Sequence, residues 1–152
     1  MLINTAVLGQ VDVDEQNIYK MPEGLYGFEE EHKWALITQQ DEGLTLMWLQ
    51  AVGDDTPCFV VFDPFEIVQD YSPKLEEADL KQLGVKSEDQ LSFLVIAVVP
   101  EDFSQISVNL KSPIALNPQT NDARQVILGG EQVWPIKYYL MGQDGNPPAQ
   151  ED

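Results

Sequence analysis

The chain has 152 residues, which is long enough for one domain with a hydrophobic core. Hydrophobic residues make up 43% of the chain, an ordinary share for a globular protein that excludes a disordered one. The net charge of −18, from 26 acidic residues against eight lysines and arginines, disfavours direct binding to nucleic acid and favours basic partners.

The amino-terminal segment carries no sign of targeting. Residues 1–15 lack a basic region followed by an apolar run, so we expect no signal peptide. No apolar stretch reaches about 18 residues, so we expect no membrane span. The only cysteine, Cys58, lies in the apolar run 58–62 and is expected to be a buried thiol. These features predict a cytoplasmic protein.

Short β-strand patterns follow one another along the chain. Residues 5–14 alternate in part, with Val11 and Val13 on one face, and a polar hairpin turn at 40–43 separates two apolar runs. The other expected strands cover residues 33–39, 44–52, 58–63, 91–99, 107–110, 113–117 and 124–129. The pattern predicts a mostly β protein: a small β-barrel-like single domain of short antiparallel strands with one or two short helices.

One helix is predicted over residues 72–84. Ser72 can cap its first turn, Pro73 suits the first helical position, and Gly84 suits the carboxyl end. The apolar stripe is narrow, so we expect the helix to lie on the barrel as a lid. Residues 1–140 are predicted to form the domain, and 141–152 a polar, flexible carboxyl-terminal tail.

Residues suited to catalysis or metal binding do not form a convincing set. His32 is the only histidine and stands in a charged stretch, while Cys58 belongs to a strand, which argues against a catalytic triad or a zinc site. Asp12, Asp14 and Glu23 fall at three positions of a calcium loop, whose sixth position lacks the required glycine. We expect no catalytic residue, cofactor or metal.

Residues 109–117, with the sequence NLKSPIALN, favour a structural role. Pro113 restricts the preceding residue to an extended conformation, while Asn109 and Asn117 can bond neighbouring main-chain groups in turns. We predict a strand with a fixed bend at a barrel corner. The alternative is that the bend presents an edge or a loop to a partner.

Four motifs in order resemble the flagellar assembly factor family FliW, over residues 3–140. EGLYGFEEE at 23–31 is similar to the family's Gly-Leu-Pro-Gly-Phe-Glu stretch, with Tyr26 at the usual proline. LQAV at 49–52 followed by FVVFDP at 59–64 resembles the family's Leu-Gln-Ser and Asp-Pro segments, with Ala51 at the frequent serine. VVPEDF with SVNLKSPIALN, and RQVIL at 124–128, complete the resemblance. Its motif residues are Gly24, Gly27, Phe28, Asp63, Pro64, Asn109, Pro113 and Asn117.

The resemblance implies a cytoplasmic, non-enzymatic β-barrel protein with two partners. One is CsrA, a small RNA-binding regulator that blocks translation of flagellin mRNA; the other is flagellin. Members bind CsrA away from its RNA surface and prevent RNA binding. New flagellin competes for the family protein and releases CsrA, and secretion of flagellin frees the family protein again.

Candidate partner contacts are exposed apolar side chains together with the acidic residues around them. The aromatic candidates are Tyr26, Phe65 and Phe103, and the acidic candidates are Asp54, Asp55 and Glu101. The competing interpretation of each aromatic residue is core packing. Two other functions stay open: an acidic mimic of nucleic acid that binds another basic protein, and a small hydrolase that uses paired carboxylates such as Asp54 and Asp55.

Overall fold

The computed structural model describes residues 1–41, 43–53, 56–129 and 132–141. Most of these residues form β-strands, with two α-helices, α1 (Pro64–Ile67) and α2 (Glu77–Leu83), and three short 3-10 helices. The strands are β1 (Leu2–Thr5), β2 (Gly9–Asp12), β3 (Ile18–Lys20), β4 (Lys33–Asp41), β5 (Leu44–Ala51), β6 (Cys58–Phe62), β7 (Ser92–Val98), β8 (Ser107–Val108), β9 (Ile114–Asn117), β10 (Asp122–Gln125) and β11 (Tyr138–Tyr139). The 3-10 helices are η1 (Glu15–Asn17), η2 (Glu88–Gln90) and η3 (Phe103–Gln105).

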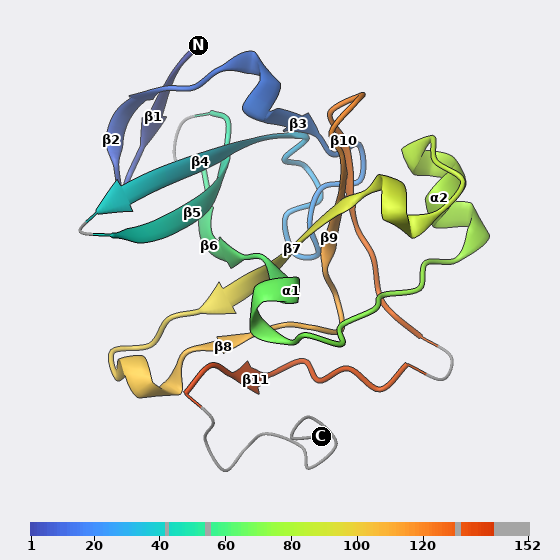
Figure 1. Ribbon diagram of the computed structural model, residues 1–152. Coiled ribbons are helices and arrows are strands. Elements are labelled where there is room, and N and C mark those ends of the chain that lie inside the picture. The colour runs from blue at the N-terminus through green and yellow to red at the C-terminus, as the bar shows by residue number, and fades with distance from the viewer. Residues whose placement is uncertain (42, 54–55, 130–131, 142–152) are drawn as a thin grey trace.

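Seven strands close into a barrel. The hydrogen-bonded order runs β7-β6-β5-β4-β3-β10-β9, and β9 pairs back with β7 to close the ring. β8 pairs with β7 at the end of that strand, and β11 pairs with β8 below the barrel (Figure 1). The predicted mostly β, barrel-like fold is confirmed. All barrel pairs are antiparallel except β3 with β10, which run parallel where Asp122 faces Lys20.

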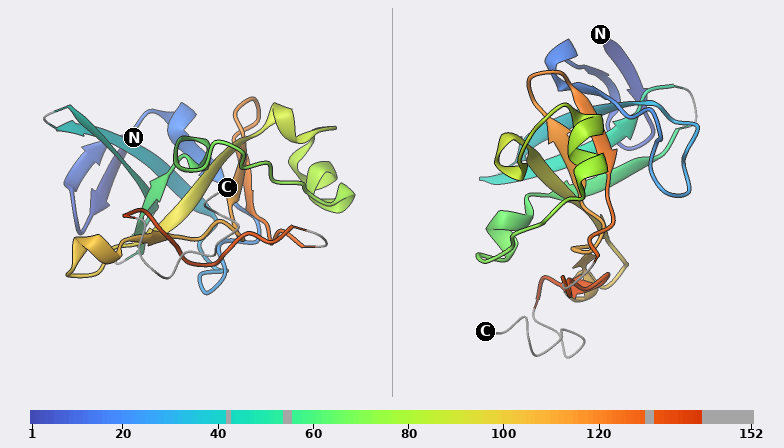
Figure 2. Two further views of the ribbon diagram at one scale, coloured as in Figure 1. Left: turned by 60° about the horizontal axis from the view of Figure 1, so that its bottom comes forward. Right: turned by 90° about the vertical axis from the view of Figure 1, so that its right-hand side faces the viewer.

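The β1–β2 hairpin forms a separate two-stranded sheet. Figures 1 and 2 show it beside β4, at the opposite end of the molecule from α2. Val11 and Val13 both pack into the cluster beneath it, so their predicted common face is confirmed. The predicted hairpin between β4 and β5 is also confirmed, although β4 continues through Gln40 to Asp41 before the chain turns.

The barrel interior is a core to which every strand of the ring except β3 contributes buried residues, while β3 adds the partly buried Tyr19. Its buried residues are Met21, Leu25, Trp34, Leu49, Ala51, Val61, Leu94, Ile114, Leu116 and Ala123. Strand β7 is buried on both faces, because Leu94 points into this core while Val95 and Ala97 pack in a second cluster outside the ring. Burial on both faces explains the unbroken apolar run in this stretch of the sequence.

The predicted helix begins later than its sequence signals indicated. Helix α2 begins at Glu77, with Glu76 as an N-cap that makes no side-chain hydrogen bond. Lys74 N donates to Gln132 Oε1 at 2.7 Å and Leu75 N donates to Glu88 Oε2 at 2.8 Å, so distant side chains hold this segment extended. The assignment of residues 72–76 to the helix was therefore wrong. The predicted end at Gly84 is confirmed by its left-handed φ of 74°.

Residues 126–128 are not part of a strand, although residues 124–129 were predicted to form one. Val126 N donates to Pro113 O at 3.0 Å, and Leu128 N donates to Lys111 O at 2.8 Å. Strand β10 itself ends at Gln125. The described residues contain no helix that is both long and apolar enough to span a membrane.

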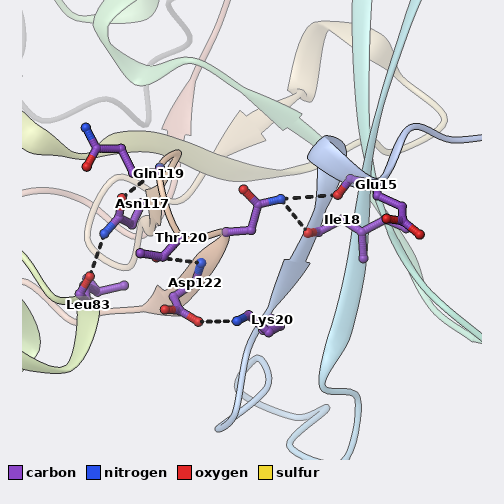
Figure 3. A network of polar contacts seen from close by, with 9 residues as sticks. Glu15, Ile18, Lys20, Leu83, Asn117, Gln119, Thr120 and Asp122 are labelled. Atoms are coloured by element: carbon purple, nitrogen blue, oxygen red, sulfur yellow. Dashed lines mark hydrogen bonds and ion pairs between the residues drawn. The ribbon is translucent and has the colours of Figure 1, made fainter.

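The turn between β9 and β10 is bonded to the distant segment formed by η1 and β3 (Figure 3). Asn121 adopts a left-handed φ of 62°, and its Nδ2 donates to Gln16 O and Ile18 O, both at 2.9 Å. Lys20 pairs with Asp122 across 3.4 Å, which joins the side chains of the parallel strands. These bonds fix β3 beside β10 and close the ring.

Candidate interaction surface

The three aromatic residues predicted as partner contacts are all exposed. The exposed fractions are 58% for Tyr26, 43% for Phe65 and 65% for Phe103, so core packing is wrong for each of them. They lie in three separate places: the loop before β4, helix α1 and helix η3. No single surface collects them.

The corner between β7 and β8 carries several exposed apolar side chains. We define the β7–β8 corner as residues 98–103, from the last residue of β7 to the first of η3. Val98 and Val99 are 59% and 44% exposed, and Phe103 follows at 65%. Buried strand β7 therefore ends by presenting its last apolar side chains to solvent. Exposed apolar groups of this kind mark protein interaction sites more often than random surface does.

Acidic residues border these apolar side chains. Glu101 is exposed and has no ion pair within the described part of the chain. Asp102 caps η3: its Oδ1 accepts from Ser104 Oγ at 2.7 Å and from Ser104 N at 3.0 Å. These hydrogen bonds hold the pKa of Asp102 below its usual range, so its carboxylate stays charged. The corner combines apolar contact area with fixed negative charge.

The chain after β11 adds a further exposed apolar group near the end of η3. Leu140 N donates to Ile106 O at 3.0 Å, which holds the end of the described chain against the residue after η3. Met141 follows with 60% of its surface exposed. Sequence reasoning missed Met141, Val98 and Val99. The apolar run of β7 extends up to Pro100 without a charged residue, which favours burial of the valines rather than exposure.

The glycine loop at 23–31 is a tight turn, with a cavity of about 170 Å³ between it and Gln125. Gly24 and Gly27 have φ values of +64° and +91°, and Leu25 bridges to Phe28 across the turn. Tyr26 N donates to Gln125 Oε1 at 2.9 Å, and Phe28 packs edge-on against Phe59 with ring centres 5.4 Å apart. These contacts hold the main chain of the loop and leave the Tyr26 ring exposed.

Phe65 stands on α1 at the mouth of a wide depression. Asp63 Oδ1 accepts from Phe65 N at 2.9 Å and caps the helix, and Pro64 occupies its first turn. The Asp-Pro motif therefore forms a helix start that the strand pattern did not predict. The Phe65 ring lies edge-on to Tyr71 at 5.7 Å and to Phe93 at 6.0 Å.

The predicted structural role of residues 109–117 agrees with their contacts. Asn109 Oδ1 accepts from Lys111 N at 3.1 Å and Ser112 N at 3.0 Å, which shapes the bend before buried Pro113. Asn117 is 4% exposed and its side chain bonds main-chain groups on both sides. The asparagines and the proline therefore position main chain.

The remaining predicted residues show no assembled chemistry. His32 is exposed, with its ring nitrogen 3.0 Å from Glu29 O, and Cys58 is half-buried with its pKa raised by that burial. The described residues contain no group of three or more histidine, cysteine or acidic residues that could hold a metal ion. Asp54 and Asp55 lie outside the described residues.

Comparisons with known proteins agree with this fold over nearly the whole chain. The family profile described as FliW protein matches residues 2–140. A flagellar assembly factor FliW of Ruminiclostridium cellulolyticum is 34% identical over 143 residues, covering 94% of this chain and 96% of that protein. One of Caldicellulosiruptor bescii is 34% identical over 139 residues, covering 91% and 90%. A crystal structure of the flagellar assembly factor FliW aligns with a TM-score of 0.82 and 27% identity, covering 95% of this chain and 99% of that one.

Proposed function

Because the chain belongs to the FliW family, as the match over residues 2–140 shows, we propose that it acts through two protein partners, CsrA and flagellin. The matched relatives are named flagellar assembly factors, and the chain is one by family and fold. The partners themselves come from the resemblance in sequence. The proposal places the chain in the cytoplasm, as a binding protein without enzymatic activity or cofactor.

In this proposal the chain couples flagellin translation to secretion. Bound to CsrA away from the RNA surface, it prevents RNA binding without competing for that surface. Newly made flagellin binds the chain as a chaperone-like partner and releases CsrA, which then represses flagellin translation. Export of flagellin frees the chain to bind CsrA again. The cycle needs only binding equilibria in which one partner displaces the other.

The observation that carries the proposal beyond family membership is the β7–β8 corner. Val98, Val99 and Phe103 present apolar surface, and Glu101 with Asp102 supplies negative charge at its edge. Interfaces gain affinity from buried apolar anchors and association rate from complementary charge. A basic RNA-binding protein fits both properties of this surface.

Calorimetric titration tests the proposal directly. Purified chain is titrated with CsrA and with flagellin from the same organism, separately and then with flagellin added to the chain–CsrA complex. We expect micromolar or tighter binding of each and displacement of CsrA by flagellin. Phe103→Ser should weaken binding of at least one partner by tenfold or more, while Val7→Ser, an exposed change on the distant β1–β2 loop, should not. Binding of neither partner would refute the proposal.

The net charge of −18 also supports a second candidate, an acidic mimic of nucleic acid. A mimic occupies the RNA-binding surface of its basic partner and competes with RNA in a simple manner. RNA should weaken binding of a mimic in proportion to its concentration without limit, whereas RNA should weaken binding at a separate site only up to the coupling factor between the two sites, beyond which the apparent Kd levels off. Titration of the chain into CsrA at increasing RNA concentrations separates the two.

A further inference from the structure

A second surface feature lies at the other end of β7 from the β7–β8 corner. It is an open cavity of about 470 Å³ with an apolar floor formed by Phe65, Tyr71, Pro73, Leu91 and Phe93. Five residue steps along β7 separate Phe93 from Val98, a distance of about 17 Å. This cavity is therefore distinct from the corner on which the proposed function draws.

The floor of the cavity is rigid. Tyr71 is 3% exposed, its hydroxyl donates to Leu110 O at 2.7 Å, and its ring packs edge-on against Trp134 at 4.8 Å. Phe65 stands over Tyr71 and buried Phe93 with 43% of its surface exposed. An apolar site whose walls are already fixed loses little conformational entropy when it is filled.

The rim of the cavity is charged. Lys74, Glu88 and Asp89 line it, and neither carboxylate has an ion pair within the described residues. Glu88 Oε2 accepts from Leu75 N at 2.8 Å, which fixes that carboxylate at the rim. The surrounding sequence, residues 63–91, holds eight acidic residues against three lysines. The field at the mouth therefore favours a cationic group over an anionic one.

We propose that this cavity is a docking site for an extended segment of a partner protein that inserts one bulky apolar side chain next to a lysine or arginine. The apolar side chain rests on Phe65 and Leu91, and the cation faces Glu88 and Asp89. The proposal goes beyond CsrA and flagellin binding, because it is argued from the cavity alone. It does not depend on which proteins bind the corner. Two separate sites allow the chain to hold two segments at once.

Trp134 supplies a built-in reporter for the test, because it contacts Tyr71 at the floor of the cavity. The full chain is titrated with a blocked, tryptophan-free nonapeptide in which one phenylalanine lies between two lysines. We expect saturable binding in the high micromolar range with a change in tryptophan emission. Trp134→Phe should remove the emission change and leave the affinity measured by calorimetry unaltered.

Matched peptides and variants decide the outcome. Replacing the peptide phenylalanine by serine, or both peptide lysines by glutamates, should weaken peptide binding at least tenfold. Phe65→Ser in the protein should weaken it by the same amount. Phe103→Ser at the corner should leave peptide binding unchanged. Asp89→Asn should weaken it about threefold and reduce its dependence on salt, and this variant serves if Phe65→Ser does not fold. Undetectable peptide binding, or equal binding of the glutamate peptide, would overturn the proposal. Either result leaves the titrations with CsrA and flagellin unaffected.

Discussion

Asn117 of β9 donates a hydrogen bond from Nδ2 to the main-chain oxygen of Leu83, the last residue of α2, across 2.8 Å. Carbonyl groups in the last turn of a helix have no partner within the helix, so this bond satisfies one of them. The same side chain accepts from Gln119 N at 3.0 Å through Oδ1 (Figure 3). One buried amide therefore attaches α2 to the β9–β10 hairpin.

Asn117→Ala should lower the free energy of unfolding by about 1–3 kcal/mol, because it leaves a buried carbonyl and a turn N–H without their partners. Chemical denaturation measures the change. The matched control is Asn17→Ala at an exposed position, which should stay within about 0.5 kcal/mol of wild type. Equal effects of the two substitutions would mean that the amide does not hold the helix.

Gly24→Ala should destabilise the protein more than Gly27→Ala does. Both glycines have positive φ, and an alanine in the left-handed region costs about 1–2 kcal/mol. At Gly24 the added Cβ would also lie 2.4 Å from Phe28 O, whereas at Gly27 nothing lies within 4 Å. We expect a loss of about 3 kcal/mol or more at Gly24 in thermal and denaturant unfolding. Equal losses at the two positions would contradict this close main-chain contact.

The sequence predicted elements whose causes are local. Apolar runs between turn residues predicted the strands, and Gly84 predicted the end of α2, where its φ of 74° needs a glycine. The same approach misplaced the start of that helix. Gln132 accepts a hydrogen bond from Lys74 N, 58 residues away in the sequence. Glu88 accepts one from Leu75 N, 13 residues away. No local sequence pattern indicates bonds over such separations.

The candidate interaction surface was predictable only in part. Phe65 and Phe103 were expected as contacts because each follows a turn next to acidic residues, and both are exposed. The same pattern could not place them at opposite ends of β7, since that separation depends on how the strand is paired. Val98 was missed because a continuous apolar run predicts burial, and the run alone does not show where cover by other segments ends.

Tyr71→Phe should lower the free energy of unfolding by about 1–3 kcal/mol, since it removes the hydrogen bond to the buried Leu110 O and leaves that oxygen unsatisfied. The measurement is urea denaturation at neutral pH. Tyr26→Phe, at an exposed ring, is the control and should be neutral. If Tyr71→Phe left the free energy of unfolding unchanged, a water molecule would have replaced the hydroxyl as the partner of Leu110 O.

Tyr71 should also make the protein sensitive to alkali. Burial raises the pKa of its hydroxyl above the unfolded value. A group whose pKa is raised on folding contributes its full stability below the unfolded pKa and loses that contribution as pH rises above about 10. Wild type should therefore lose stability above pH 10 more steeply than Tyr71→Phe does. Parallel pH profiles of the two proteins would refute this assignment.

Asp102 should make helix η3 sensitive to acid. The pKa of Asp102 is held below its ordinary value of 3.8. The cap therefore stabilises η3 fully at pH values above 3.8, and this stabilisation is lost as the pH falls through the lowered pKa. The amide resonance of Ser104 should shift as pH falls below about 4. In Asp102→Asn the side-chain oxygen still accepts a hydrogen bond, so the cap should remain and the shift should vanish. A shift that persists in this variant would have another source.

Glu101→Lys should slow association with CsrA severalfold and change dissociation little, because a charge at the edge of an interface steers the encounter more than it holds the complex. The same is expected of charge reversal at Asp54 or Asp55. Stopped-flow kinetics at increasing salt measure the effect, which should shrink as salt screens the charge. Glu77→Lys on α2 makes the same change in net charge far from the corner and should slow association less. If Glu101→Lys left the salt dependence of the association rate unchanged, the corner would not steer the partner.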